Sequence, residues 1–216
     1  MIEHVYRHAS DARGIAQVIV ATDDERIADV VRAFGGTVQM TRADHRTGTD
    51  RLAEVAATLT CDIVVNVQGD LPLLDSSAIE AAVAPLIGDE TLQMCTICTP
   101  IRDEADYHNP NVVKVVRNNL GDALYFSRAP IPFRRVGPGP TTFKHIGLYA
   151  YRRTFVGTFA ALPPTPLEIA ESLEQLRAME HGYRIHAVLT NIESIEIDTP
   201  EDLERVRRLM AVTARN

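Results

Sequence analysis

The 216-residue chain contains no tryptophan, three cysteines and, among its 22 basic residues, only two lysines. Acidic residues number 29, so the formal net charge is −7, which argues against a protein that binds the nucleic-acid backbone through a basic face. No apolar run is long enough to span a membrane, and no signal-peptide pattern is present. An odd number of cysteines in apolar segments is typical of reduced thiols. We therefore expect a cytoplasmic protein whose partners include neither nucleic acid nor membrane.

Two glycine-rich signatures of phosphate binding, G-x-G-x-x-G and G-x-x-x-x-G-K-[ST], are also absent. In a doubly wound fold, the loop after the first strand usually binds phosphate. Here the first predicted element is a helix, because Ile2, Val5, Tyr6 and Ala9 recur at helical spacing and no strand-like run precedes them. The usual anion cradle is missing from the sequence.

What the chain does contain is an alternation of helical and strand-like patterns. Strand-like runs at 18–21, 37–40 and 63–67 are separated by helical spacing at 27–34 and 52–59. Continuous β-branched runs between helices are typical of parallel strands that are covered on both faces. We predict an α/β fold with a doubly wound, mostly parallel sheet.

The pattern changes between residues 100 and 151. Strand-like runs at 111–116, 123–127 and 146–151 surround a hairpin turn at 118–121. A helix over 167–182, a strand over 185–189 and a helix from Pro200 follow. We predict one domain, 1–216, in which residues 100–151 form a β-rich insertion, named here the lobe.

Two aspartates follow predicted strands. Asp70 ends the run N-V-Q-G-D, and Asp198 precedes a capping box formed by Thr199, Pro200 and Asp202. Carboxylates at the carboxyl edge of an open α/β sheet suit a Mg²⁺ ion that also takes substrate oxygens. The alternative is that Asp70 only starts a turn. If the two aspartates meet at one edge, they form a metal site.

Two other polar segments are candidates for ligand binding. The loop R-A-D-H-R-T-G-T-D-R, residues 42–51, offers hydroxyls and a helix N-terminus to an anion or a base edge, although the loop taken alone favours a capped helix entry with solvated arginines. In the lobe, Arg128 and His145 are candidates for holding a sugar carboxylate, with Ser127 and Tyr149 on its hydroxyls. The alternative is a core aromatic pair with a surface histidine. Helical spacing places four polar residues on a solvated face: Glu171, Glu174, Gln175 and Arg177.

In order along the chain, these segments resemble the 3-deoxy-manno-octulosonate (Kdo) cytidylyltransferases. The resemblance is carried by V-I-V-A-T-D-D from Val18, M-T-R-A-D-H-R-T-G-T-D-R from Met40, V-N-V-Q-G-D-L-P from Val65, N-P-N-V-V-K-V-V from Asn109, A-L-Y-F-S-R-A-P-I-P from Ala123, H-I-G-L-Y-A-Y from His145, L-E-Q-L-R from Leu173 and I-D-T-P-E-D-L-E-R-V from Ile197.

The resemblance implies a fold like that of nucleotide-diphospho-sugar transferases and a reaction of CTP with Kdo, an acidic eight-carbon sugar. The products would be pyrophosphate and CMP-Kdo, which is used in lipopolysaccharide synthesis, and Mg²⁺ would neutralise phosphate charge. The implied metal-binding and catalytic residues are Asp70 and Asp198. The implied nucleotide-binding residues are Thr47, Gly48, Thr49, Arg51 and Gln68. The implied sugar-binding residues are Arg128, His145, Tyr149, Glu174 and Gln175. A homodimer through the lobe and its neighbouring helix is also implied.

Members of this family begin with a strand and an A-R-x-x-S-x-R-L-P-x-K loop that holds the triphosphate, whereas Met1 aligns with the helix after it. Losing charge-stabilising contacts costs on the order of 10²–10³ in rate each, so we expect this chain alone to be inactive or impaired. Two alternatives stay open. One is transfer to another acidic sugar, such as a sialic acid or an amino analogue of Kdo. The other is a non-catalytic remnant that binds a sugar or pairs with a full-length subunit.

Overall fold

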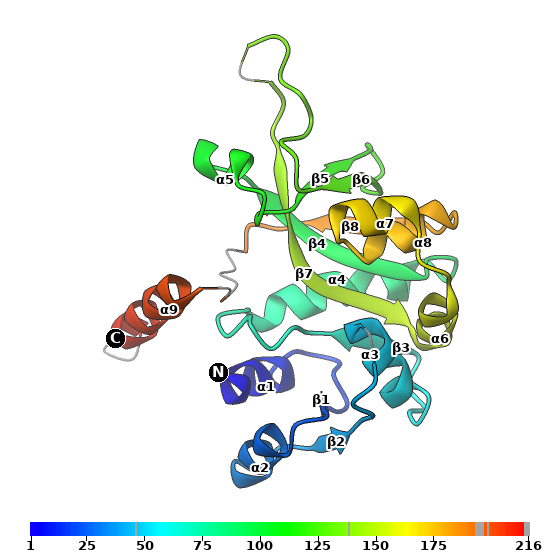
Figure 1. The fold of residues 1–216 in the computed structure, drawn as a ribbon, viewed down its shortest axis with the longest axis vertical. Coiled ribbons are helices and arrows are strands. Elements are labelled where there is room, and N and C mark those ends of the chain that lie inside the picture. The colour runs from blue at the N-terminus through cyan, green and yellow to red at the C-terminus, as the bar shows by residue number, and fades with distance from the viewer. Residues whose placement is uncertain (46, 138, 193–196, 198, 214–216) are drawn as a thin grey trace.

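The computed structural model describes residues 1–45, 47–137, 139–192, 197 and 199–213 (Figure 1). The elements, in chain order, are α1 (Ile2–Ser10), β1 (Val20–Thr22), α2 (Glu25–Ala33), β2 (Val38–Met40), α3 (Gly48–Ala56), β3 (Ile63–Asn66), α4 (Ser76–Gly88), β4 (Met94–Pro100), α5 (Glu104–His108), β5 (Lys114–Arg117), β6 (Ala123–Ser127), β7 (Phe143–Arg152), α6 (Arg153–Ala161), α7 (Pro166–Glu171), α8 (Gln175–Glu180), β8 (Ile185–Leu189) and α9 (Pro200–Thr213).

The central sheet is mixed. Its order is β6-β5-β7-β4-β8, and β3 pairs with β7, while β1 and β2 form a separate parallel pair. Strand β7 runs antiparallel to β3, β4 and β5, whereas β4 and β8 are parallel. The strands β3, β4 and β8 therefore share one direction. The α/β class is confirmed. Strands β6 and β7 run opposite to β3, β4, β5 and β8, because the β5–β6 hairpin reverses the chain before β7, and most neighbouring strands of this sheet therefore pair antiparallel.

Helices cover both faces of this sheet, as the continuous apolar strands predicted. Successive residues of β7 divide between two core clusters: Tyr149 and Tyr151 belong to one, and Leu148 and Ala150 to the other. The first cluster includes residues of α3, α6 and α8, and the second includes residues of α1 and α4. The core therefore lies in two layers, one on each side of the sheet.

Cys95 and Cys98 of β4 belong to different core clusters. Burial raises the pKa of the Cys95 thiol to about 12 and that of Cys98 to about 11. Both are free thiols, so this pair has the inert character expected of core cysteines.

The prediction of a single helix over 167–182 is wrong, because this segment forms two short helices. Helix α7 ends at Glu171 and is capped by Ser172, whose backbone is left-handed with φ 52° and ψ 49°, and α8 begins at Gln175. A residue with a Cβ atom adopts this conformation at a cost, and it reverses the chain sharply. The break turns Glu171 and Glu174 toward different neighbours.

The hairpin between β5 and β6 is confirmed. Asn118 accepts hydrogen bonds from the N–H groups of Leu120 and Asp122 through its Oδ1 atom, at 2.9 Å each. Gly121 has a φ of +91°, and a Cβ atom there would lie 2.6 Å from His186 Cε1. Only glycine fits both the backbone and this contact. Within the described chain, none of the helices is both long and apolar enough to cross a membrane.

Candidate active site

Asp70 lies four residues beyond the carboxyl end of β3. Its side chain is half-buried, and the next residue, Leu71, is fully buried in the core. The backbone N–H of Ile197 donates to the carbonyl oxygen of Asp70 at 3.1 Å. This bond brings the segment after β8 to the end of β3, as the metal-site hypothesis requires. Asp198, the next residue after Ile197, lies outside the described residues.

The donor chemistry at Asp70 suits a hard divalent cation, since a half-buried carboxylate at a sheet edge keeps one side open to water and substrate. Among the residues that the structure describes, no group of three histidine, cysteine or acidic side chains is placed to hold a metal ion. The predicted pair includes Asp198, so the metal site remains a prediction.

On the nucleotide side, the first turn of α3 carries three of the predicted residues. Thr47 is the N-cap of α3, and its Oγ1 atom accepts from the N–H of Asp50 at 3.2 Å. Gly48 is exposed, and Thr49 is 2% exposed. The Thr49 hydroxyl donates to Glu174 Oε2 at 2.6 Å, which connects this turn to a predicted sugar-binding residue.

Arg51 ties the ends of β1 and β2 to α3. Its Nη2 atom lies 2.9 Å from Oδ1 of Asp23, just after β1, and its Nη1 atom donates to the hydroxyl of Thr41, just after β2. His45 in the same loop contacts Glu54 of α3, and this hydrogen bond lowers the Glu54 pKa. The arginine and the histidine therefore stabilise the loop. Gln68 is exposed beyond the end of β3.

In the lobe, Arg128 is held at the end of β6. Its backbone N–H donates to Glu171 Oε2 at 2.9 Å, and its Nε atom donates to the Glu171 carbonyl at 2.8 Å. Its Nη1 atom donates to the carbonyl of Pro110 at 3.1 Å. Ser127 donates to Glu171 Oε1 at 2.6 Å. The side chain predicted to bind a sugar carboxylate is thus fixed by a residue that the helical pattern placed on a solvated face.

His145 is half-buried among aromatic rings. Its ring centroid is 5.1 Å from that of Phe126 and 5.2 Å from that of Tyr149, and its Nε2 atom lies 2.9 Å from the hydroxyl of Thr96. Burial lowers the pKa of His145 to about 3. The imidazole is neutral at neutral pH, so it offers a hydrogen bond to a ligand but no positive charge. Of the two predicted carboxylate-binding side chains, only Arg128 is a cation.

The predicted solvated face around α8 is wrong for two of its residues. Gln175 is 5% exposed and Arg177 is 4% exposed. Arg177 Nε donates to Glu168 Oε2 at 2.8 Å, forming a buried ion pair that satisfies both groups. Within the described structure, Gln175 Nε2 has no hydrogen-bond partner. A buried amide donor of this kind is available to a ligand oxygen.

Sequence reasoning missed Lys114. This residue is 0% exposed, and its ammonium donates to the carbonyls of Asn109, Val112 and Arg128 at 2.8, 2.6 and 2.7 Å. Burial lowers its pKa. A lone lysine inside the run V-V-K-V-V is a detectable signal, because a charged residue within an apolar strand needs buried partners.

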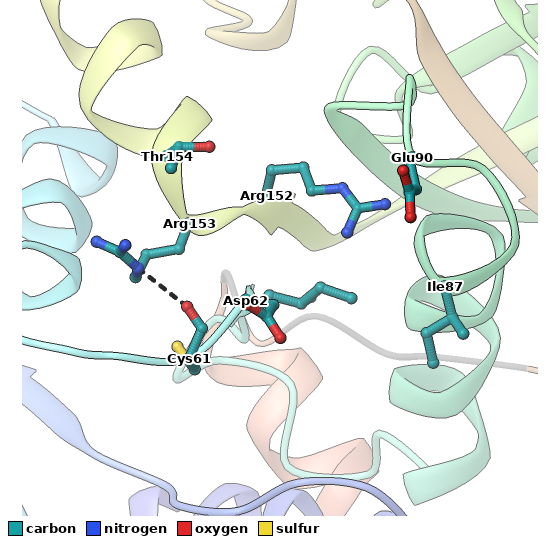
Figure 2. Close-up of a pocket in the computed structure, with 8 residues that line it drawn as sticks. Cys61, Asp62, Ile87, Glu90, Arg152, Arg153 and Thr154 are labelled. Atoms are coloured by element: carbon teal, nitrogen blue, oxygen red, sulfur yellow. Dashed lines mark hydrogen bonds between the residues drawn. The ribbon is translucent and has the colours of Figure 1, made fainter.

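A surface pocket of about 550 Å³ lies at the opposite end of β3 (Figure 2). It is lined by Cys61, Asp62, Ile63, Ile87, Glu90, Arg152, Arg153 and Thr154. Arg153 Nε donates to the carbonyl of Cys61 at 2.9 Å. The pocket contains none of the predicted site residues and lies at the amino end of the strand that Asp70 follows.

A family model described as cytidylyltransferase matches residues 1–185. The chain is 52% identical to the 3-deoxy-manno-octulosonate cytidylyltransferase of Geobacter metallireducens, over 95% of this chain and 85% of that protein. It is 57% identical to the protein of the same description from Syntrophotalea carbinolica, over 95% of this chain and 86% of that protein. Among solved structures, a CMP:2-keto-3-deoxy-manno-octonic acid synthetase complexed with CTP matches at 44% identity with a TM-score of 0.94, over 98% of this chain and 88% of that one. A 4-diphosphocytidyl-2C-methyl-D-erythritol synthase, at 13% identity and a TM-score of 0.64, shares the fold.

Proposed function

The chain belongs to the 3-deoxy-manno-octulosonate cytidylyltransferases, and from this premise we propose that it transfers CMP from CTP to the anomeric hydroxyl of Kdo, releasing pyrophosphate. The product is an activated sugar for lipopolysaccharide synthesis. The observation that carries this proposal is identity above 50% to proteins of that activity along nearly the whole chain. The alternatives of another acidic sugar and of a non-catalytic remnant find no support in these relatives.

On the nucleotide side, we assign CTP to the turn of Thr47, Gly48 and Thr49, together with Arg51 and Gln68. The exposed N-terminus of α3 suits a negatively charged or polar ligand. Arg51 is paired with Asp23, so an anionic ligand competes with that carboxylate for the guanidinium. The two side chains are 23% and 37% exposed, so the pair is partly open to water and to a ligand.

On the sugar side, we assign Kdo to Arg128, His145, Tyr149, Glu174 and Gln175. Arg128 supplies the positive charge for the sugar carboxylate. The neutral His145 and the buried amide of Gln175 supply hydrogen bonds without charge. Hydrogen bonds hold Arg128, His145 and Glu174 before the ligand arrives, so their contribution to the rate is to orient the sugar hydroxyl toward the nucleotide.

We propose that Asp70 and Asp198 hold Mg²⁺. The bond from Ile197 N–H to the carbonyl of Asp70 supports this, because it joins the two segments that carry the carboxylates. When bound, the ion neutralises phosphate charge on the nucleotide. The protein's part is to hold two oxygen ligands at the sheet edge between the nucleotide side and the sugar side.

We also propose a cytoplasmic homodimer that associates through the lobe. Large apolar side chains are exposed there, including Leu124 at 58%, Phe133 at 84% and Val136 at 85%. In Figure 1 the segment that follows β6 extends away from the body of the molecule. Light scattering should give twice the chain mass, and Phe133→Ser with Val136→Ser should shift the population toward the monomer. A wild-type monomer at all concentrations would contradict the dimer.

The function is tested by measuring pyrophosphate release and ligand-induced thermal stabilisation with CTP, Mg²⁺ and Kdo. Stabilisation is included because it reports ligand binding without requiring turnover. Kdo should give larger effects than N-acetylneuraminate, and CTP larger effects than UTP. Preference for a different acidic sugar in both measurements would overturn the proposal.

A further inference from the structure

Glu171, the last residue of α7, receives several hydrogen bonds from the end of β6. Its carboxylate accepts from the Ser127 hydroxyl at 2.6 Å, from the Arg128 N–H at 2.9 Å and from the Tyr125 hydroxyl at 3.4 Å. Burial raises the pKa of Glu171, but the hydrogen bonds from Ser127 and Arg128 outweigh it, and the net pKa is lowered. The group is therefore an anion surrounded by donors, a strong arrangement for hydrogen bonding.

The same residue also holds the side chain of Arg128, since the Glu171 carbonyl accepts from Nε at 2.8 Å. Lys114 holds the Arg128 carbonyl, and Pro110 accepts from Nη1. Arg128 is thus bonded at its N–H, Nε, Nη1 and carbonyl. Its Nη2 atom makes no hydrogen bond to another residue in the described part of the chain. The guanidinium is fixed with one nitrogen left for a ligand.

The left-handed backbone of Ser172 places Glu171 and Glu174 on different sides of the break between α7 and α8. It ends α7 directly after Glu171, and the chain then enters α8 with Glu174 at its start. One short reversal therefore presents Glu171 to Arg128 and Glu174 to Thr49. A continuous helix would place residues three apart on the same face and could not reach both partners.

We propose that Glu171 is a positioning residue for the sugar site, which acts by holding Arg128 in the orientation that binds the sugar carboxylate. This inference rests on the proposed function. Glu171 contacts Arg128 and Ser127, and its effect on the sugar passes through Arg128. Removing its charge should therefore weaken sugar recognition and leave nucleotide recognition intact.

The first test is Glu171→Gln, assayed by separate KM values for Kdo and CTP. Glutamine keeps the size but has one acceptor oxygen, and its NH₂ group opposes the donors that now converge there. The KM for Kdo should rise about tenfold or more, since bonds to charged groups are strong, while the KM for CTP stays within about twofold. Glu25→Gln, at an exposed residue of α2, is the matched control and should change neither value. Equal changes in both KM values would overturn the proposal.

The second test combines Glu171→Gln with Arg128→Ala. Because Glu171 acts through Arg128, the double variant should have a KM for Kdo close to that of Arg128→Ala alone. Additive effects would contradict the proposed route. If Arg128→Ala leaves the KM for Kdo unchanged, the assignment of the sugar site fails. If Arg128→Ala raises it and Glu171→Gln does not, only this inference fails.

A milder variant guards against a loss of folding. Ser127→Ala removes one donor to Glu171 and adds no charge, and Ser127 is otherwise bonded only to the N–H of Ala129 among the described side-chain contacts. It should raise the KM for Kdo by about threefold, in line with one hydrogen bond of modest strength. No change in the KM for Kdo with Ser127→Ala, together with a misfolded Glu171→Gln, would also overturn the proposal.

Discussion

The nucleotide side and the sugar side are built from polar groups in opposite ways. On the nucleotide side, β1 and β2 are three residues each, and an ion pair such as Arg42–Asp44, whose side chains are 69% and 70% exposed, lies open to solvent. On the sugar side, Arg177 and Glu168 are paired at 5% and 11% side-chain exposure, and the Lys114 ammonium is enclosed by three carbonyls.

This difference indicates that the nucleotide side can exchange its ion-pair partners for a ligand, whereas the sugar side selects its ligand. Exposed pairs are worth little and are easily replaced by a charged ligand such as a triphosphate. Buried pairs and hydrogen bonds are costly to break, so they fix the orientation of the groups that surround a ligand. The sugar side is therefore organised in advance, and it is the part of the molecule expected to distinguish one acidic sugar from another.

The largest expected effect comes from the two lysines, which provide a matched pair. Lys114→Met leaves three carbonyls without their buried donor and should lower the free energy of unfolding by about 3 kcal/mol. Lys144→Met, on β7, should change it by less than about 0.5 kcal/mol, as expected of a side chain outside such a network. Denaturant unfolding measures both. Equal losses in the free energy of unfolding would show that the hydrogen bonds of Lys114 contribute no more to stability than an ordinary strand position.

The next effect is a pH dependence of stability that comes from His145. Its pKa is about 3 in the folded protein, below the usual value of 6.5, so between these values the unfolded chain binds a proton that the folded protein does not. Stability should fall as the pH falls below 6.5, by up to about 1.4 kcal/mol per pH unit. His145→Gln should flatten this slope, and His181→Gln, an exposed control, should keep it. An unchanged slope in His145→Gln would contradict the burial argument.

A smaller effect is expected where the two sides meet. The Thr49 hydroxyl donates to Glu174, so binding on one side should strengthen binding on the other. Calorimetric titration of Kdo, with and without a non-reacting CTP analogue, should show this coupling in the wild type. Thr49→Val should reduce it by about tenfold, whereas Thr49→Ser should retain it. Coupling that survives in Thr49→Val would place the connection elsewhere.

The smallest effect is expected on the exposed surface of the nucleotide side. Arg26 lowers the pKa of Asp24 to about 2, yet the Arg26 side chain is 90% exposed. Arg26→Ala should leave the thermal midpoint unchanged, because water replaces the lost partner. A clear loss of stability would show that exposed pairs are not weak in this protein.

Local patterns in the sequence predicted most of the elements. The helix at α1 and the hairpin turn at Asn118 depend on contacts within a few residues, and β6 pairs with the strand directly before it, so the sequence encodes these elements locally. The break at Ser172 was missed, because the helical spacing of apolar residues continues through it. The reversed direction of β7 was missed because strand direction depends on pairing between distant segments.

For the candidate site too, the sequence predicted what depends on residue type and missed what depends on distant contacts. Residue types and order indicated Arg128, His145 and Asp70, but not their surroundings. The neutral state of His145 depends on Phe126 and Tyr149, and the role of Glu171 depends on a strand 44 residues away. Charge state and positioning arise from tertiary packing, so they cannot be derived from the spacing of residues alone.

The central claim is that the ends of β3 and β8 bring Asp70 and Asp198 together on one divalent ion. Titration of Mn²⁺, followed by the electron paramagnetic resonance signal of the free ion, tests this without turnover. Wild type should bind one ion, and Asp70→Asn and Asp198→Asn should each weaken binding by about a hundredfold or more, since even outer-shell partners are worth about 10–100-fold. Mn²⁺ binding by Asp198→Asn that equals that of the wild type would contradict the account.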